Sequence, residues 1–188
     1  MDDGYNPIKS EIESLKKKVE TLEQQLKEKA YGRVAVLADA LELAPKMRKA
    51  DREELRAADD ISPLEALVTP FTIDDSRVYS ILGTGKEGLV GMFGVAPSDL
   101  DTYGIAWLLA AEDLFKHNKT FIKECPHWIK EMGKDYQYLY NFVDRRNWKV
   151  LKWLQHLGFE PKQELNEFGV GKLPFLLMLK EMETNNVR

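Results

Sequence analysis

The sequence contains a single cysteine, Cys125, among 188 residues. One thiol cannot form an internal disulfide, and this usage is typical of proteins kept in a reducing compartment. Charge of one sign is not in excess, because 27 basic side chains stand against 31 acidic ones and give a net charge of −4. This balance argues against wholesale binding to nucleic acid or to a membrane surface. No spacing of His, Cys and carboxylate residues supports a zinc site, so we expect no metal.

Long apolar runs are missing as well. No run approaches the ~20 residues that a membrane-spanning helix needs. The chain starts with Met-Asp-Asp, which is acidic where a secretory signal peptide carries basic residues followed by an apolar core. These absences favour a soluble protein made in a cytoplasm. The length favours one globular domain with an appendage.

The appendage is a helix expected over residues 7–31, which have the clearest periodicity in the chain. Its apolar residues are spaced by four and three positions, as in a coiled-coil heptad: Ile8, Ile12, Leu15, Val19, Leu22 and Leu26. With β-branched residues at a and Leu at d, the pattern favours a parallel pair. In that register Glu11 faces Lys16 of the partner helix, and Lys18 faces Glu23. We predict that this helix pairs with a second copy or docks on another helical protein; the alternative is that it folds back on its own domain.

Residues 1–31 are thus separated from a globular domain over residues 32–188. The expected strands lie at 33–38, 78–82, 89–95, 104–110, 136–143 and 173–179, and the expected helices at 39–58, 63–68, 117–133 and 147–157. Asp39 is expected to cap one helix, and Ser62 and Glu65 form a capping box before another. Residues 83–88 join two strands and predict a hairpin turn rather than a phosphate loop. The order predicts an α/β (α+β) fold with a mixed central sheet flanked by helices and with its later strands parallel or splayed.

One late segment carries a family resemblance. It runs Asn147-Trp-Lys-Val-Leu-Lys-Trp-Leu-Gln-His-Leu-Gly-Phe159, and it is similar to the segment of the GNAT acetyltransferase superfamily in which Asn starts a helix and Gly-Phe ends it. Asn147 can cap this helix, Leu151 and Leu154 can face the core, and Gly158 permits the left-handed conformation that ends it. The order of strands and helices also resembles that superfamily.

A longer resemblance rests on three segments, Ala38-Asp-Ala-Leu-Glu-Leu-Ala-Pro-Lys-Met-Arg-Lys-Ala-Asp51, Ile105-Ala-Trp-Leu-Leu-Ala110 and Asn141-Phe-Val-Asp-Arg-Arg-Asn-Trp148. Through them residues 34–159 resemble GNAT-like proteins of tailed bacteriophages, including internal core proteins of short-tailed phages. The resemblance implies a virion-associated protein that is made in the host cytoplasm. Its implied partners are itself or other virion proteins, such as portal, core or tail components.

The resemblance also implies what an active enzyme would need. GNAT enzymes bind the diphosphate of coenzyme A on backbone amides, which a glycine-rich turn after the central strand exposes. The corresponding residues 110–120 contain no glycine, and Glu112 and Asp113 stand where phosphates would lie. The family's tyrosine acid corresponds to Leu154, which cannot protonate a thiolate. The main hypothesis is therefore a non-enzymatic virion structural protein with a degenerate acetyltransferase fold and no cofactor, assembled through its N-terminal helix.

The alternative hypothesis is a phage-encoded N-acetyltransferase that uses acetyl-CoA. Glu112 would then be the base, and the residues near the helix start would bind the cofactor: Lys116, His117, Asn118, Lys119, Thr120 and Asn147. Arg145 and Arg146 either grip an anionic group or pair locally with Asp144.

Three other features are expected to be structural. His127 and His156 lie on amphipathic helical segments, where packing is favoured over ligand binding. Cys125 has no activating base nearby in the sequence and is expected to be a semi-buried thiol. The aromatic-rich segment 136–153 is expected to place most rings in the core, with several on the surface, where aromatic side chains anchor interfaces.

Overall fold

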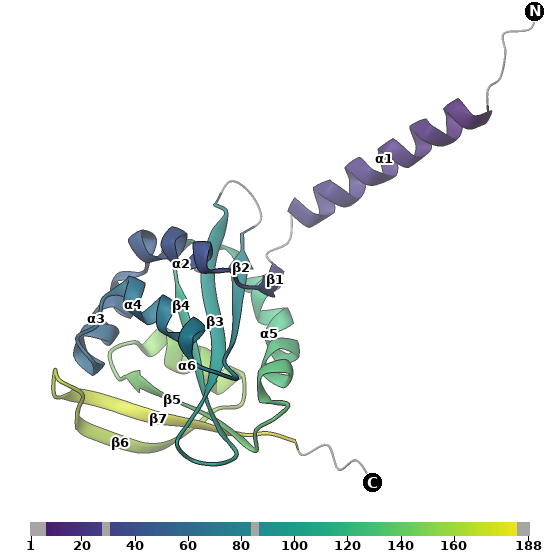
Figure 1. Ribbon diagram of the computed structural model, residues 1–188. Coiled ribbons are helices and arrows are strands. Elements are labelled where there is room, and N and C mark those ends of the chain that lie inside the picture. Colours follow the sequence, from purple (N-terminus) through teal and green to yellow (C-terminus); the bar gives the residue numbers. More distant parts are fainter. Residues whose placement is uncertain (1–6, 28–30, 84–86, 184–188) are drawn as a thin grey trace, which may run out of the picture.

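The computed structural model describes residues 7–27, 31–83 and 87–183 (Figure 1). The elements follow in the order α1 (Pro7–Lys27), β1 (Tyr31–Val34), α2 (Leu37–Leu43), η1 (Ala44–Lys46), α3 (Lys49–Ala58), α4 (Pro63–Val68), η2 (Thr69–Thr72), β2 (Arg77–Leu82), β3 (Leu89–Pro97), β4 (Tyr103–Ala110), η3 (Glu112–His117), α5 (Asn118–Gly133), β5 (Tyr138–Asp144), α6 (Trp148–His156), β6 (Glu160–Phe168) and β7 (Leu173–Glu181). The three η elements are short 3-10 helices.

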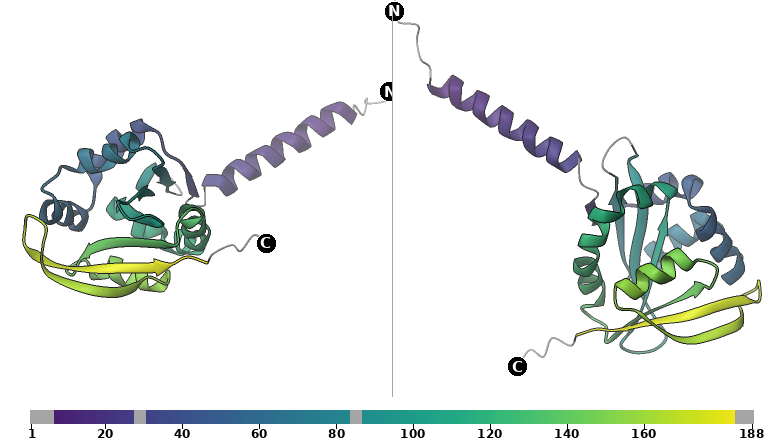
Figure 2. Two further views of the ribbon diagram at one scale, coloured as in Figure 1. Left: turned by 60° about the horizontal axis from the view of Figure 1, so that its bottom comes forward. Right: turned by 180° about the vertical axis from the view of Figure 1, so that it is seen from behind.

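The strands form one mixed sheet in the order β1-β2-β3-β4-β5-β7-β6. All neighbours are antiparallel except β4 and β5, which run parallel. These two strands pair only at Tyr103–Tyr138, Gly104–Leu139 and Ile105–Tyr140. Beyond Ile105, β4 pairs with β3 alone, and beyond Tyr140, β5 pairs with β7 alone. The sheet therefore divides into two wings that separate from this point, as the views in Figure 2 show.

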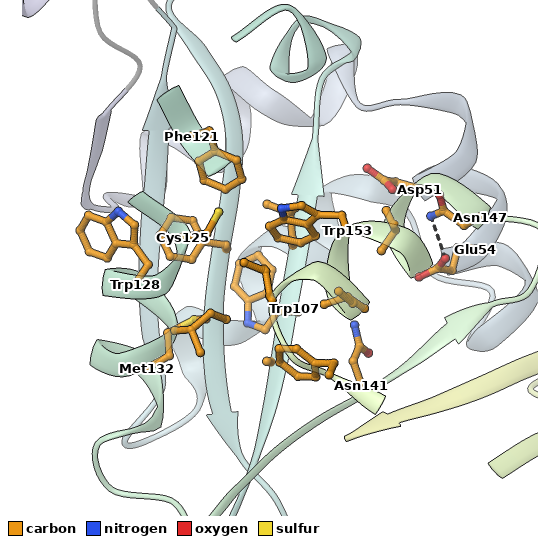
Figure 3. A pocket seen from close by; sticks show the side chains of 18 residues that line it. Asp51, Glu54, Trp107, Phe121, Cys125, Trp128, Met132, Asn141, Asn147 and Trp153 are labelled. Carbon is orange, nitrogen blue, oxygen red and sulfur yellow. Dashed lines mark hydrogen bonds between the residues drawn. The ribbon is translucent and has the colours of Figure 1, made fainter. Parts of the chain in front are cut away.

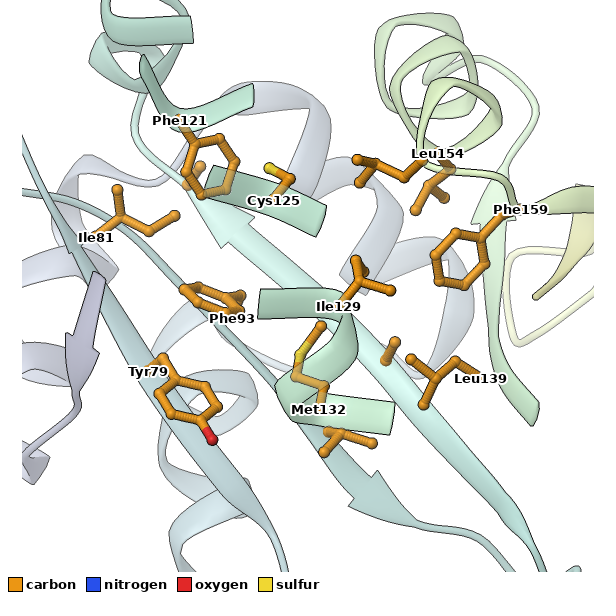
Figure 4. Close-up of a cluster of buried hydrophobic side chains, with 14 of the residues drawn as sticks. Tyr79, Ile81, Phe93, Phe121, Cys125, Ile129, Met132, Leu139, Leu154 and Phe159 are labelled. Carbon is orange, nitrogen blue, oxygen red and sulfur yellow. The ribbon is translucent and has the colours of Figure 1, made fainter. Parts of the chain in front are cut away.

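Helices cover both faces of the sheet (Figures 1 and 2). Helices α5 and α6 lie on one face, where they build the larger core with residues such as Phe93, Phe121, Leu139 and Phe159 (Figure 4). Helices α2 and α4 cover the other face around a second cluster of buried residues that includes Met92. Apolar side chains project from both faces of β3 and β4 and pack into the two cores, as expected of central strands.

The α/β class, the mixed sheet flanked by helices and the N-terminal helix are confirmed. The expected helix at 39–58 is divided, because Pro45 has no backbone N–H to continue α2 and the chain passes through η1 before α3 begins. Asp39 does not precede a helix as expected. It lies in the first turn of α2, where its carboxylate accepts a hydrogen bond from the Val36 N–H at 2.9 Å. The predicted capping box at Ser62 is present and begins α4.

Strand β6 was not expected, for a physical reason. Its residues are almost all exposed and polar, with Pro161 near its start, so no alternation of apolar residues marks it. It is an edge strand that pairs only with β7. Edge strands need only one partner and tolerate proline, which explains why this sequence still forms a strand.

Helix α1 projects away from the rest of the described chain in Figure 1. Its seam residues Ile12, Leu15 and Val19 are about half exposed, at 48%, 57% and 52%. The side chains of Leu22 and Leu26, which complete the predicted seam, lie outside the described residues. Within the described part of the chain, no helix is long and apolar enough to cross a membrane. The same residues contain no group of three or more His, Cys, Asp or Glu that could hold a metal ion.

Candidate functional site

The separation of β4 from β5 creates a wedge between the two wings of the sheet. At the end of β4 the Ala110 N–H donates to Oδ2 of Asp51 at 3.0 Å, and its C=O accepts from the Arg48 N–H at 2.7 Å. Both main-chain groups of Ala110 therefore point away from β3. Because these groups alternate in direction along a strand, those of Leu108 and Ala106 point the same way, into the wedge. They lie beyond the three residue pairs that join β4 to β5.

Arg48 and Asp51 close the wide end of this wedge. They are only 2% and 3% exposed, and the Arg48 guanidinium grips the Asp51 carboxylate with two hydrogen bonds, one of them from Nε to Oδ2 at 2.8 Å. Burial raises the pKa of Asp51 even though Arg48 and the Ala110 N–H oppose that rise. This ion pair binds the start of α3 to the last residue of β4, at the position where a neighbouring strand would otherwise continue the sheet.

Glu54 lies one turn further along α3, beside β5. Its Oε2 accepts a hydrogen bond from Nδ2 of Asn147 at 3.0 Å (Figure 3) and another from the Asp144 N–H at 3.3 Å. Burial, with a smaller contribution from the negative charges of Asp51 and Asp144, raises the pKa of Glu54 to about 7, although the two hydrogen bonds oppose the rise. Both hydrogen bonds end on Oε2, so among the described residues Oε1 is the oxygen that can accept a proton from a ligand. A carboxylate with this pKa exchanges a proton near neutral pH.

A small cavity of about 40 Å³ joins Glu54 to the core. Its wall is mostly aromatic and aliphatic, with Trp153 at its centre in Figure 3. The polar side chains that line it are Asp51, Glu54, Asn141 and Asn147. The cavity thus brings two carboxylates and two neutral amides to an otherwise apolar enclosure.

A second cavity of about 290 Å³ lies next to the first, with Leu108, Phe121, Val150 and Trp153 lining both. Its remaining lining residues are Arg48, Leu114, Ile122, Lys149, Lys152 and His156. No described residue of this lining is acidic, and three of its basic side chains come from α6. The two cavities together run from a basic opening, past apolar side chains and the main chain of β4, to Glu54.

This path fits the pantetheine arm of a coenzyme A thioester, but the segment after β4 does not fit its diphosphate. The pantetheine arm has two amides and an apolar remainder, which suit the main-chain groups of Ala106 and Leu108 and the apolar walls. The diphosphate cradle is different, because the segment after β4 forms η3 with Glu112 and Asp113 in its first turn and contains no glycine. Glu112 is exposed and lines neither cavity. The side chains of Lys116, His117, Asn118, Lys119 and Thr120 lie outside the described residues.

The other sequence candidates have ordinary surroundings. Asn147 occupies the N-cap position of α6 but does not cap it with its side chain as expected; its Nδ2 donates to Glu54. Arg146 pairs with Asp144, the local partner that was one of the two expectations, and Arg145 pairs with Glu164 of β6. Gly158 has the predicted left-handed conformation, with φ at 84°.

The predicted roles of the histidines and the cysteine differ in outcome. His127 and His156 are both exposed. The ring of His127 lies edge-on to Trp128 with the ring centres 5.2 Å apart, and His156 lines the second cavity. Cys125 is more buried than expected, at 3% exposed, and burial raises its pKa to about 12, which keeps it a thiol. The residues between 83 and 88 that the structure describes join β2 to β3, as a hairpin requires.

Several solved structures have a fold similar to that of this chain. A spermidine N-acetyltransferase from Vibrio cholerae in complex with CoA and spermine is 15% identical with a TM-score of 0.59, over 81% of this chain and 95% of that one. The fold is that of the GNAT acetyltransferases. A GCN5-related N-acetyltransferase from Kribbella flavida is 18% identical with a TM-score of 0.62, over 82% and 99% of the two chains. A ribosomal-protein-S5-alanine acetyltransferase from Vibrio fischeri is 15% identical with a TM-score of 0.59, over 84% and 95%.

Two further comparisons found nothing: no protein-family model matches the sequence, and no curated protein matches it either. The GNAT-like fold predicted from the sequence is therefore confirmed by structure. The phage and virion context remains a prediction.

Sequence reasoning missed Glu54 as a site residue, although a signal was present. Asp51 and Glu54 are three residues apart, which puts two carboxylates on one face of a helix. What the sequence did not reveal is that this face turns toward the end of β4. The sequence instead suggested Glu112, in the segment after the central strand, as the base.

Proposed function

We propose that this chain is an N-acyltransferase that moves an acyl group from a coenzyme A thioester to an amine. One observation carries the proposal: Glu54, with its pKa raised to about 7, lies at the inner end of the path between β4 and β5. A GNAT-like fold alone would not justify this choice, since folds host many functions. The site adds support, because it combines the Glu54 carboxylate, which can accept a proton, with two adjoining cavities that can hold an extended ligand.

The chemistry requires an amine in its neutral form. An alkyl ammonium must lose a proton before its nitrogen can attack an acyl carbon, and Glu54 can accept that proton at Oε1. When bound, the thioester would supply the activated acyl carbon. The new carbon–nitrogen bond would replace its carbon–sulfur bond, and a second proton of the attacking nitrogen would leave with the thiol. Asn147 holds Glu54 in place through Oε2, and the apolar wall around Trp153 keeps water away from the reacting atoms. Leu154, at the position of the family's tyrosine acid, is 7% exposed and belongs to the core.

The proposal is tested with the full-length protein, acetyl-CoA and a panel of amines. The panel should contain spermidine, spermine and peptides with N-terminal alanine, because the names of similar structures mention such compounds. Release of free thiol that depends on both substrates is the expected result. If no amine causes thiol release and calorimetry detects no binding of coenzyme A, the proposal is wrong.

A second candidate is a non-enzymatic structural role in a phage virion, with portal, core or tail proteins as partners. The observation that favours it is η3, a glycine-free 3-10 helix where an active family member is expected to have a glycine-rich turn. The exposed seam of α1 provides a means of assembly. Mass spectrometry of purified particles would detect the protein if this role holds, and thioester-dependent acylation by the pure protein would contradict it.

A further inference from the structure

The second cavity suggests how the acyl donor is anchored without a glycine-rich turn. Lys149, Lys152 and His156 are spaced by three and four residues, so they project from one face of α6. All three are exposed while also lining the cavity, and this places their polar ends at its opening.

The two lysines also lie near the same aromatic ring. Their Nζ atoms lie 5.9 Å and 5.2 Å from the ring centre of Trp148, at the start of α6. An aromatic ring attracts ammonium groups and limits where their long side chains can go. These two ammonium groups lie beside a cavity whose described lining contains basic but no acidic side chains, although the whole chain carries a net charge of −4.

We propose that Lys149 and Lys152, with His156, bind the phosphate of the phosphopantetheine group of the acyl donor. This inference rests on the proposed acyltransferase function and names the side chains of α6 as the phosphate site. The phosphate then lies at the basic opening, the pantetheine arm follows the main chain of β4, and the acyl end reaches the cavity of Glu54. Ammonium side chains in this way take over the role that backbone amides have at a glycine-rich turn.

The experiment compares two double variants of the full-length protein. The test variant carries Lys149→Ala and Lys152→Ala. The control carries Lys130→Ala and Lys162→Ala, which removes the same charge from exposed positions on α5 and β6 that line neither cavity. Calorimetric titration with coenzyme A and with 4′-phosphopantetheine measures the affinity of each. Circular dichroism confirms that both variants are folded.

We expect the test variant to bind both compounds about tenfold more weakly, as two partly exposed charge contacts would give. The control should bind as the wild type does, and the salt dependence of binding should be smaller in the test variant alone. Equal affinity of test and control variants would overturn the phosphate site and leave the acyltransferase proposal intact. Absence of any binding by the wild type would overturn both.

An independent observation concerns α1. We infer that two copies of this chain pair through α1 in parallel. Leu15 and Val19 remain exposed on a helix that stands clear of the domain in Figure 1, and the charged positions beside the seam attract each other in the parallel register.

Light scattering tests this pairing with a matched pair of variants. Leu15→Lys with Val19→Lys places charge in the seam, whereas Ser14→Lys with Thr21→Lys places the same charge outside it. We expect a dimer for the wild type and the second variant and a monomer for the first. An introduced Ile12→Cys should form a disulfide between copies on oxidation, since Cys125 is buried and a positions meet in parallel pairs. A monomeric wild type would overturn the inference.

Discussion

Nδ2 of Asn147 donates a hydrogen bond to Oε2 of Glu54 across 3.0 Å, and so joins the start of α6 to α3. The contact spans the wedge between the two wings of the sheet and fixes the carboxylate that faces it. It also uses the side chain that would otherwise cap α6. Asn147, which was expected to cap α6, thus holds the side chain of Glu54 instead.

Replacing Glu54 by Gln should lower kcat of acyl transfer by a factor of about 100 or more, because a general base contributes at least this much. Binding of coenzyme A should change little, since the charge lies at the inner end of the path. Steady-state kinetics and calorimetry measure the two effects. Glu53→Gln is the control, because Glu53 is exposed on the same helix and pairs with Lys49. Full activity of Glu54→Gln would remove Glu54 from the mechanism.

The hydrogen bond of Asn147 should be visible in the pH dependence of kcat/KM. Its amide favours the ionised form of Glu54, so Asn147→Ala should raise the pKa of Glu54 and move the acidic limb of the profile to higher pH. Exposed Asn166 of β6 offers a control, and Asn166→Ala should leave the profile unchanged. A lower kcat at every pH with an unmoved profile would contradict this role.

Stability should depend on pH through the same carboxyl group. A folded-state pKa raised from 4.5 to about 7 means that the contribution of Glu54 to stability is complete below pH 4.5 and is lost as pH rises through 7. The loss is at most about 3 kcal/mol. Glu54→Gln should therefore gain stability relative to the wild type between pH 5 and pH 8, measured by urea unfolding. The prediction fails if the difference between the two proteins is the same at both pH values, and Glu53→Gln again serves as the control.

The Arg48–Asp51 pair should be the most sensitive to single substitutions. Replacing Asp51 by Asn removes a carboxylate that neutralises a buried guanidinium and should reduce the free energy of unfolding by about 3–5 kcal/mol. Adding Arg48→Met to that variant should recover part of the loss, because the buried positive charge is removed as well. Lys49→Met with Glu53→Gln, at an exposed pair on the same helix, should cost less than about 1 kcal/mol. Equal costs for the two pairs would show that burial of Arg48 and Asp51 is unimportant.

The sequence predicted the elements that have strong local signals. The Ser62 box, the hairpin between β2 and β3 and the apolar run of β4 each carry their own pattern, and all three are present. Strand β6 could not be recognised, because its pairing with β7 is a tertiary property that its exposed residues do not encode. The division of residues 39–58 depends on a single proline within an otherwise helical pattern.

The site was harder to predict than the fold. Glu54 belongs to α3 and Asn147 precedes α6, 93 residues later, so their meeting depends on how both helices lie against the sheet. The sequence shows directly that the segment after β4 contains no glycine. It does not show the cavity beside α6, because the basic residues that line this cavity lie far from that segment along the chain.

Because β4 and β5 share only three residue pairs, side chains of α5 and α6 in the larger core also join the two wings. Main-chain ladders have a fixed spacing of about 4.8 Å, whereas packed side chains can be exchanged for smaller or larger ones. Phe121 and Trp153, stacked at 5.8 Å between α5 and α6, line both cavities. Substitution of either ring would therefore change the space beside β4 without altering the sheet.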